Sequence, residues 1–126
     1  MTKRQYLLSI WLPAALLGCA ANDTVYTPPV SPTSVAGKDQ IVQPNTLVTL
    51  DGTGSSDPLG RQLGYHWSIA SAPTGSTAAI AMPFFSKTTI TPDLEGTYDI
   101  LLVVSAGTEQ EGSTMHIYAS YADAGM

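Results

Sequence analysis

The sequence predicts an all-β fold, a two-sheet antiparallel sandwich of about seven short strands. Three observations support this prediction. Short runs of β-branched and aromatic residues alternate with polar residues, and turn residues interrupt them about every eight to twelve positions. The chain of 126 residues contains 11 glycines and 9 prolines, as many turns require. A helical period does not extend convincingly over any stretch of about eleven residues.

The strands follow one another along the chain with a turn signal between neighbours. We expect them at residues 38–43, 47–51, 63–69, 78–82, 87–91, 97–106 and 113–120. The expected turns lie at residues 44–45, 51–60, 72–75, 92–96 and 107–112, where Gly, Pro, Asn and Asp gather. Because side chains alternate between the faces of a strand, every second residue should point into the core. These inward residues are Val48, Leu50, Tyr65, Trp67, Ile69, Tyr98, Ile100, Leu102 and Val104.

The first 18 residues have the form of a secretory signal. Lys3 and Arg4 give a positive start, and the apolar stretch that follows ends at Leu17. Spanning a bilayer takes about 20 apolar residues in a helix, so this stretch is too short, and Pro13 interrupts it. We therefore expect a cleaved leader.

The leader ends in Leu16-Leu17-Gly18-Cys19, which resembles the lipobox of bacterial lipoproteins. The resemblance implies cleavage before Cys19 and acylation of its thiol and its new amino group, which gives stable anchoring to a membrane. Ala20 and Ala21 follow where an aspartate would favour retention in the inner membrane, so delivery to the outer membrane is implied. The alternative is an ordinary signal peptide with an accidental cysteine.

Residues 20–35 contain three prolines, small polar residues and no apolar period, which is typical of a tether. Pro28 to Pro32 are equally compatible with a segment that lies along the first strand. We expect a signal peptide at residues 1–18, a lipidated cysteine and tether at 19–35, a sandwich at 36–120 and a short tail at 121–126.

The charge and the cysteine count exclude two classes of protein. After Cys19 the chain keeps three basic and ten acidic residues, a net charge of −7. Such an acidic domain has no basic patch for phosphates, which argues against nucleic-acid binding. Cys19 is the one cysteine, so a disulfide framework is excluded and the core must hold the domain together.

Several motifs resemble the PKD-type domains, which are immunoglobulin-like. They are the run from Val48 to Pro58 (VTLDGTGSSDP), Tyr65-His66-Trp67, the run from Ser71 to Ser76 and the run from Thr91 to Tyr98. The resemblance covers about residues 35 to 120. It implies a central buried Trp67 and a tyrosine corner at Tyr98, and a role in adhesion, spacing, or protein or glycan contact.

The sequence departs from that family at one loop. Many relatives carry a cluster of carboxylates after Asp57-Pro58 that could hold calcium, whereas this chain has Leu59 and Arg61 at two of those positions. Calcium prefers six to eight oxygen ligands, and a guanidinium would repel it. We therefore expect no metal and no other cofactor apart from the covalent lipid on Cys19.

Catalytic motifs are missing from the sequence. The Asp51–Ser55 run lacks the spacing and the second loop of an aspartic protease, and no serine, histidine and acid form a nucleophile setting. His66 and His116 should lie about 10 Å apart, two strand spacings, which is too far for one zinc ion. We predict a protein that is not an enzyme.

A contact face is the more interesting prediction. If Ile100, Leu102 and Val104 point inward, the alternating residues of that strand point outward beside imidazole and aromatic groups, as in a binding patch. The candidate partner face comprises His66, Leu101, Val103, His116 and Tyr118. An alternative is that a long central strand is simply apolar on both faces.

We expect a lipid-anchored envelope module that contacts another envelope protein, as an accessory subunit of an envelope or secretion assembly. Two alternatives stay open. One is a module that binds glycan or peptidoglycan through exposed aromatics, for which Phe84, Phe85, Tyr118 and Tyr121 are the candidates. The other is a passive spacer.

Overall fold

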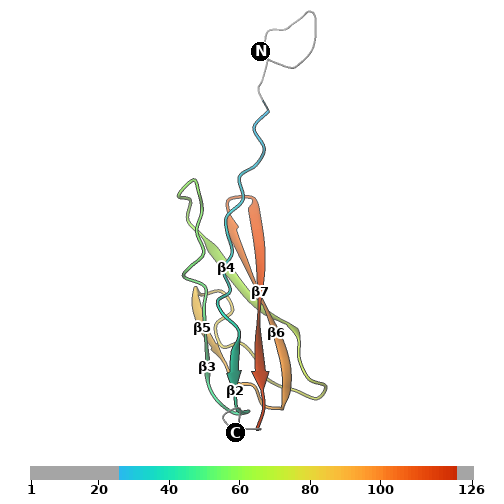
Figure 1. Cartoon of the computed structure of the whole chain (residues 1–126). Coiled ribbons are helices and arrows are strands. Elements are labelled where there is room, and N and C mark those ends of the chain that lie inside the picture. Colours follow the sequence, from blue (N-terminus) through green and yellow to red (C-terminus); the bar gives the residue numbers. More distant parts are fainter. Residues whose placement is uncertain (1–25, 122–126) are drawn as a thin grey trace, which may run out of the picture.

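The computed structural model describes residues 26–121 (Figure 1). The signal peptide, Cys19 and the tail beyond Tyr121 lie outside the described residues. Within them the chain forms strands and turns without a helix, and none of its elements could therefore cross a membrane as a helix. The strands are β2 (Gln40–Val42), β3 (Val48–Asp51), β4 (Gly64–Ser71), β5 (Lys87–Ile90), β6 (Gly96–Ala106) and β7 (Glu109–Ala119).

The strands form two sheets. The larger has the order β2-β7-β6-β4, and the smaller pairs β3 with β5. All neighbours are antiparallel except β2 and β7, which run parallel. Figure 1 shows β3 and β5 together on the left of the view, with β2, β7 and β6 to their right. The predicted all-β, two-sheet sandwich is confirmed.

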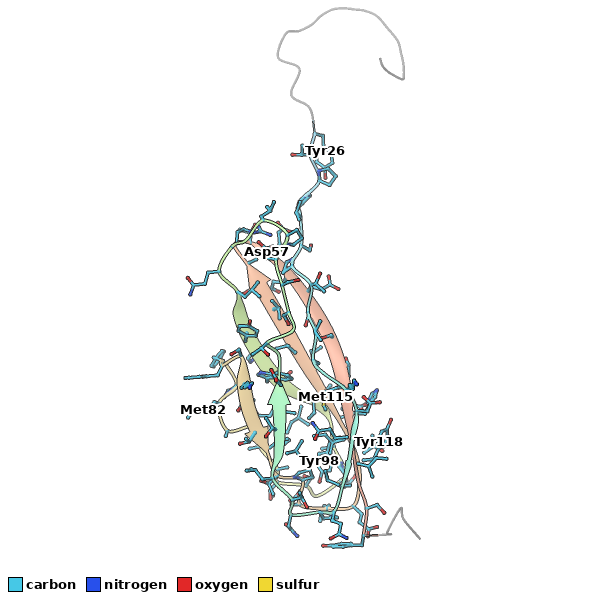
Figure 2. The ribbon with its side chains drawn as sticks, turned by 60° about the vertical axis from the view of Figure 1, so that its left-hand side comes forward. Tyr26, Asp57, Met82, Tyr98, Met115 and Tyr118 are labelled. Atoms are coloured by element: carbon cyan, nitrogen blue, oxygen red, sulfur yellow. The ribbon has the colours of Figure 1, made fainter. Side chains whose placement is uncertain are left out.

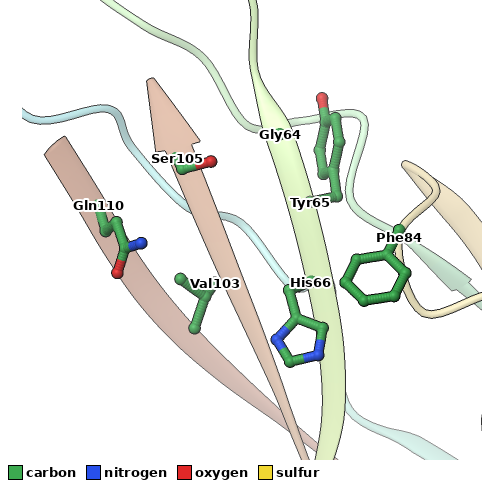
Figure 3. Close-up of a pocket in the computed structure, with 7 residues that line it drawn as sticks. All are labelled: Gly64, Tyr65, His66, Phe84, Val103, Ser105 and Gln110. Carbon is green, nitrogen blue, oxygen red and sulfur yellow. The ribbon is translucent and has the colours of Figure 1, made fainter. Parts of the chain in front are cut away.

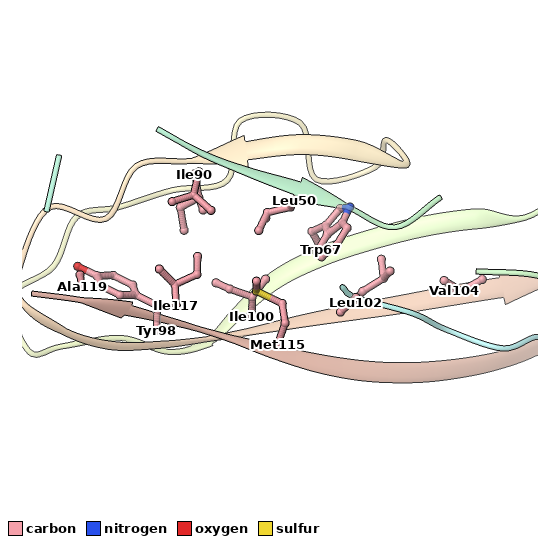
Figure 4. Close-up of a cluster of buried hydrophobic side chains, with 12 residues drawn as sticks. Leu50, Trp67, Ile90, Tyr98, Ile100, Leu102, Val104, Met115, Ile117 and Ala119 are labelled. Atoms are coloured by element: carbon pink, nitrogen blue, oxygen red, sulfur yellow. The ribbon is translucent and has the colours of Figure 1, made fainter. Parts of the chain in front are cut away.

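The core fills the space between the sheets, as Figure 4 shows. On β6 every second residue is buried, while the residues between them are half-buried on the other face. Because β6 is central, its alternation sets the inside and outside of both neighbours. The buried hydrophobic cluster comprises Ala36, Val48, Leu50, Trp67, Ile90, Tyr98, Ile100, Leu102, Val104, Met115, Ile117 and Ala119.

Trp67 lies at the centre of this core with 1% of its surface exposed. Its indole Nε1 donates a hydrogen bond of 2.9 Å to the backbone oxygen of Phe85, which satisfies the polar atom of the ring inside the protein. Gly52 packs against the ring, where a Cβ would stand 3.1 Å from Trp67 Cζ2 and 2.8 Å from a methyl carbon of Leu102. The tryptophan therefore fixes the loop before β5 as well as the contact between the sheets.

Tyr98 forms a corner at the start of β6. Its hydroxyl oxygen lies 3.0 Å from the backbone nitrogen of Leu94, which donates to it, and 3.1 Å from Asp93 Oδ1. Ser76 and Thr77 also donate to the Asp93 carboxylate. These hydrogen bonds, that from the Ser76 hydroxyl first, lower the pKa of Asp93. The turn before β6 is thus tied to the 72–77 loop.

One predicted strand and the length of one predicted turn are wrong, and apart from the start of β7 the bounds of the other strands differ by at most two residues from the prediction. Residues 78–82 form no strand, because they meet β5 through one isolated bridge, Ile80 with Ile90, and the N–H of Met82 bonds to the Thr88 hydroxyl instead of a backbone oxygen. The predicted turn at 107–112 is shorter than expected. Gly107, at φ 64°, closes it so early that β7 begins at Glu109, opposite Ala106.

The residues before β2 are attached to the domain. Thr33 and Ser56 exchange two backbone hydrogen bonds, and the Ser34 hydroxyl donates to the carbonyl of Leu102. The backbone nitrogen of Val35 donates to Ser55. Residues 33–35 therefore lie along the sandwich. The boundary between tether and domain stays a prediction.

Candidate partner-binding face

The five predicted face residues lie on one surface. His66 comes from β4, Leu101 and Val103 from β6, and His116 and Tyr118 from β7. All five point away from the core, because they alternate with buried residues of the same strands. We call the outward side of β4, β6 and β7 the outer sheet face.

Leu101 and Val103 form the aliphatic part of this face. Val103 lies between His66 on β4 and Gly112 on β7, and Leu101 lies opposite Thr114. A Cβ at Gly112 would stand 3.4 Å from Leu101 Cδ1 and 3.9 Å from Val103 Cγ2. The glycine thus leaves space beside both half-buried aliphatic side chains on the β7 side, where a larger residue would crowd them.

The other half of the face is polar. His116 lies opposite Asp99, and its Nδ1 is 2.8 Å from Asp99 Oδ1. The backbone nitrogen of His116 donates to Asp39 Oδ1 over 2.9 Å. The imidazole ring also lies 6.1 Å, centroid to centroid, from the ring of Tyr118. A partner that covers this half meets Asp99 already hydrogen-bonded.

The two histidines lie further apart than the sequence predicted. The estimate of about 10 Å placed both at one level of the sheet. The register instead puts His66 opposite Val103 and His116 opposite Asp99, which lies four residues earlier on β6. This offset adds about 13 Å along the strand, at about 3.3 Å per residue. Residues 26–121 contain no group of three potential metal ligands.

Phe84 joins the face from the loop before β5, a contribution that the sequence analysis missed. Its ring stacks on His66, with centroids 5.0 Å apart and an interplanar angle of 13°. Phe84 is nevertheless 69% exposed. Two adjacent phenylalanines after a proline are the signal that could have suggested a surface role, but the stacking partner lies 18 residues away.

A shallow hollow lies beside this stack (Figure 3). It extends from β7 across β6 to the free edge of β4, where Gly64 has no side chain to close it. Its lining is apolar and neutral-polar without a lysine, arginine or carboxylate. The lining residues are Gly64, Tyr65, His66, Phe84, Val103, Ser105 and Gln110.

The loop that resembles a calcium site is closed by an internal cation. Arg61 donates from Nε to Asp57 Oδ2 and from Nη2 to Asp57 Oδ1, over 2.9 and 2.7 Å. The Asp57 side chain is 1% exposed. The hydrogen bonds from the Arg61 side chain lower the pKa of Asp57 to about 2. Both carboxylate oxygens are thus engaged by the guanidinium, and the residues present do not fit a calcium ion.

The four candidate sugar-binding aromatics do not form one platform. Phe84 stacks on His66, and Phe85 is 61% exposed in the same loop. Tyr118 lies near the end of β7, and the backbone nitrogen of Tyr121 just beyond it donates to Glu95. Figure 2 shows Tyr118 well away from the Met82 loop that carries the two phenylalanines.

Comparisons with known proteins agree with this architecture. A family model described as "K319L-like, PKD domain" matches residues 36–117. No curated protein matches the chain in sequence.

Three solved structures share the fold. The PKD domain of the KIAA 1837 protein is 26% identical with a TM-score of 0.60, over 75% of this chain and 92% of that one. The PKD domain of human KIAA0319 is 19% identical with a TM-score of 0.62, over 86% and 97%. A nucleoside hydrolase-related protein from Saccharophagus degradans, associated with carbohydrate metabolism, is 20% identical with a TM-score of 0.64. That match covers 71% of this chain but only 26% of the other protein.

Proposed function

Because this chain belongs to the family of K319L-like PKD domains, whose members are in general binding modules and not enzymes, we propose that its outer sheet face binds another protein of the bacterial envelope. The proposal includes a lipid anchor on Cys19 and a place in the outer membrane. These two points rest on the resemblance of the leader to a lipobox and on Ala20 and Ala21 after the cysteine.

The observation that carries the contact is the aliphatic pair Leu101 and Val103 on an uncharged part of an acidic domain. Residues 26–121 hold eight acidic and three basic side chains. On the outward side of β6, from Thr97 to Ser105, the one charged residue is Asp99, which is hydrogen-bonded to His116. The central parts of protein interfaces are depleted of charged residues in the same way.

A pair of charge substitutions tests this face. Leu101→Glu with Val103→Lys places two charges at its centre and should abolish the capture of a defined envelope protein from gently solubilised envelopes. The matched control is Thr49→Glu with Thr89→Lys, a directly opposed pair on the smaller sheet. We expect the control to retain the partner. An unchanged list of captured proteins for the first variant, with its melting temperature preserved, would reject the proposal.

The anchor is tested separately. Cys19→Ala should move the protein out of the membrane fraction. If the partner is then lost while the purified chain still binds it in solution, the anchor acts by placing the domain. Retention of the Cys19→Ala chain in the membrane fraction would contradict lipid anchoring and leave the face proposal standing.

Glycan binding is the second candidate function, and it is favoured by the exposed ring of Phe84, which lines the same hollow as Ser105 and Gln110. Such a site offers an apolar ring together with neutral hydrogen-bonding groups. Cosedimentation with purified peptidoglycan that depends on Phe84, but not on Leu101, would transfer the function to glycan. A chain that captures neither protein nor glycan would be a spacer.

A further inference from the structure

The hollow beside Phe84 lies at the free edge of β4, and this edge has a backbone position open to a further strand. β4 is the last strand of its sheet. Trp67 lies opposite Leu102 of β6, but its N–H points away from β6 and donates to the carbonyl of Pro83 over 2.7 Å. Backbone groups of successive residues alternate in direction, so the N–H and C=O of Tyr65 also point outward.

Two residues after Tyr65, the edge of β4 is already hydrogen-bonded within the protein. The carbonyl oxygen of Pro83, in the loop before β5, accepts the hydrogen bond from Trp67 and thereby closes the edge at that position. Among residues 26–121 no backbone or side-chain partner reaches the N–H of Tyr65. An exposed edge of this kind is a template for a strand from another chain.

The hollow supplies room for side chains on both sides of such a strand. Tyr65 and His66 point to opposite faces of β4, and Figure 3 shows Phe84 beside them at the edge. Residues of an added strand would alternate in the same way, one set toward Tyr65 and the other toward His66 and Val103. Gly64 leaves space on the side of His66, because a Cβ there would stand 2.7 Å from the Ser105 hydroxyl oxygen.

We propose that the edge of β4 at Tyr65 binds an extended polypeptide segment of the partner protein as an additional strand, a proposal that rests on the proposed function. The lining of the hollow contains no lysine, arginine or carboxylate, so the central residues of the segment should be uncharged and partly apolar. The surrounding domain has a surplus of five acidic side chains within residues 26–121, so basic flanks should favour binding. The same surplus opposes a second copy of this chain.

The probe is a synthetic peptide of alternating valine and threonine with a lysine at each end, added to the full chain purified in detergent. Hydrogen exchange resolved to single amides should show slow exchange at Trp67 in the free chain and a newly protected Tyr65 amide with the peptide. N-methylation of the peptide amides that would face β4 should weaken binding about tenfold or more, since it removes backbone hydrogen bonds. Glutamates in place of the terminal lysines should also weaken it.

Variants extend the test. Phe84→Ala should weaken binding of the peptide, and Tyr65→Pro should abolish it by removing the donor that faces away from β6. Because Tyr65→Pro could also disturb β4, the N-methylated peptide decides the matter without any change to the protein. Binding that leaves the Tyr65 amide unprotected, equal binding of the N-methylated peptide, or no binding would each overturn strand addition.

The outcomes separate this inference from the proposed function. Protection of Tyr65 in a dimer of the chain without peptide would show a second copy as the occupant and would overturn the partner assigned here. If peptide binding fails while the Leu101 and Val103 variant still loses its captured protein, the face stands and only strand addition falls. If the peptide binds at Tyr65 while that variant keeps its partner, the edge is correct and the broader face is wrong.

Discussion

Arg61 donates hydrogen bonds to both carboxylate oxygens of Asp57 and also to the backbone of Val30, in the segment before the domain. Its Nη2 donates to Asp57 Oδ1 over 2.7 Å and to the carbonyl oxygen of Val30 over 2.6 Å. The Arg61 side chain thus connects the buried carboxylate of Asp57 with the segment around Val30 that precedes the domain. Figure 2 places Asp57 at the end of the domain from which the Tyr26 segment extends.

This pair should make stability depend on acidic pH. The pKa of Asp57 is lowered to about 2 by Arg61, so between about pH 4 and pH 2 the folded chain binds fewer protons than the unfolded chain. The stabilisation is present above about pH 4 and is lost as the pH falls through that range. Urea unfolding at pH 7, 4 and 2 should show a smaller loss for Asp57→Asn than for the parent chain. Identical pH profiles would contradict this linkage.

Calcium should leave the domain unchanged. Because Arg61 engages both oxygens of Asp57, an added ion would have to displace a guanidinium. We expect equal melting temperatures in millimolar calcium and in chelator. Arg61→Asp offers the contrast, since it restores an acidic residue to the loop, and any calcium response should appear only there. A calcium-dependent rise in the parent chain would show that this loop, or another site, binds the ion.

Trp67→Ala should cost about 3 to 5 kcal/mol, the range for deleting a large aromatic from a packed core. Trp67 is 1% exposed and also holds the Phe85 carbonyl. For a domain with no disulfide this could be most of its stability. Thermal unfolding measures the loss, and Phe85→Ala is a suitable control because that side chain is 61% exposed. Equal melting temperatures of the two variants would argue against the central role of the Trp67 indole.

Tyr98→Phe should cost about 1 to 3 kcal/mol, because the backbone N–H of Leu94 and the Asp93 carboxylate lose a buried partner while the ring stays in place. The comparison is Tyr118→Phe, in which the altered hydroxyl belongs to a side chain that is 40% exposed and should matter little. Chemical denaturation of both variants distinguishes them. An equally large loss of stability for Tyr118→Phe would mean that the hydrogen bonds of the Tyr98 corner do not account for the effect.

Gly52→Ala should destabilise by about 1 to 3 kcal/mol through crowding, since the new methyl group would stand 2.8 Å from Leu102 Cδ2 and 3.2 Å from the Ser86 carbonyl oxygen. Gly54→Ala, two residues on, meets Val35 at 3.4 Å and should be tolerated better. The two melting temperatures give the test. A harmless Gly52→Ala would show that the loop before β5 can move away from the core.

The sequence predicted the core well because the alternation on the central strand is long. Tyr98, Ile100, Leu102 and Val104 are all 0% exposed, as the period of two requires. The same period misled at residues 78–82, where apolar side chains pack against the core although the backbone barely joins β5. Alternation reports which side chains are buried and not which backbone groups are paired.

The face was predicted only in part for a related reason. Leu101 and Val103 follow from the alternation of one strand, but the stack of Phe84 on His66 depends on how a loop returns to β4. The offset between His66 and His116 depends on the register of three strands, which period alone does not specify. The start of β7 was missed because Glu109, Gln110 and Glu111 carry no apolar signal, while the ladder with β6 continues through them.

The parallel pairing of β2 with β7 has a mechanical consequence. Gln40, Ile41 and Val42 pair with Ile117, Tyr118 and Ala119, and the N-terminal segment enters β2 from the end where Arg61 holds Val30. If the proposed partner on the outer sheet face and the proposed anchor at Cys19 are pulled apart, the load travels along β2. Because ladder hydrogen bonds lie across the strands, such a load shears them together and does not peel them apart one at a time. The same short strand that closes the sheet would therefore act as a strain-resistant attachment point.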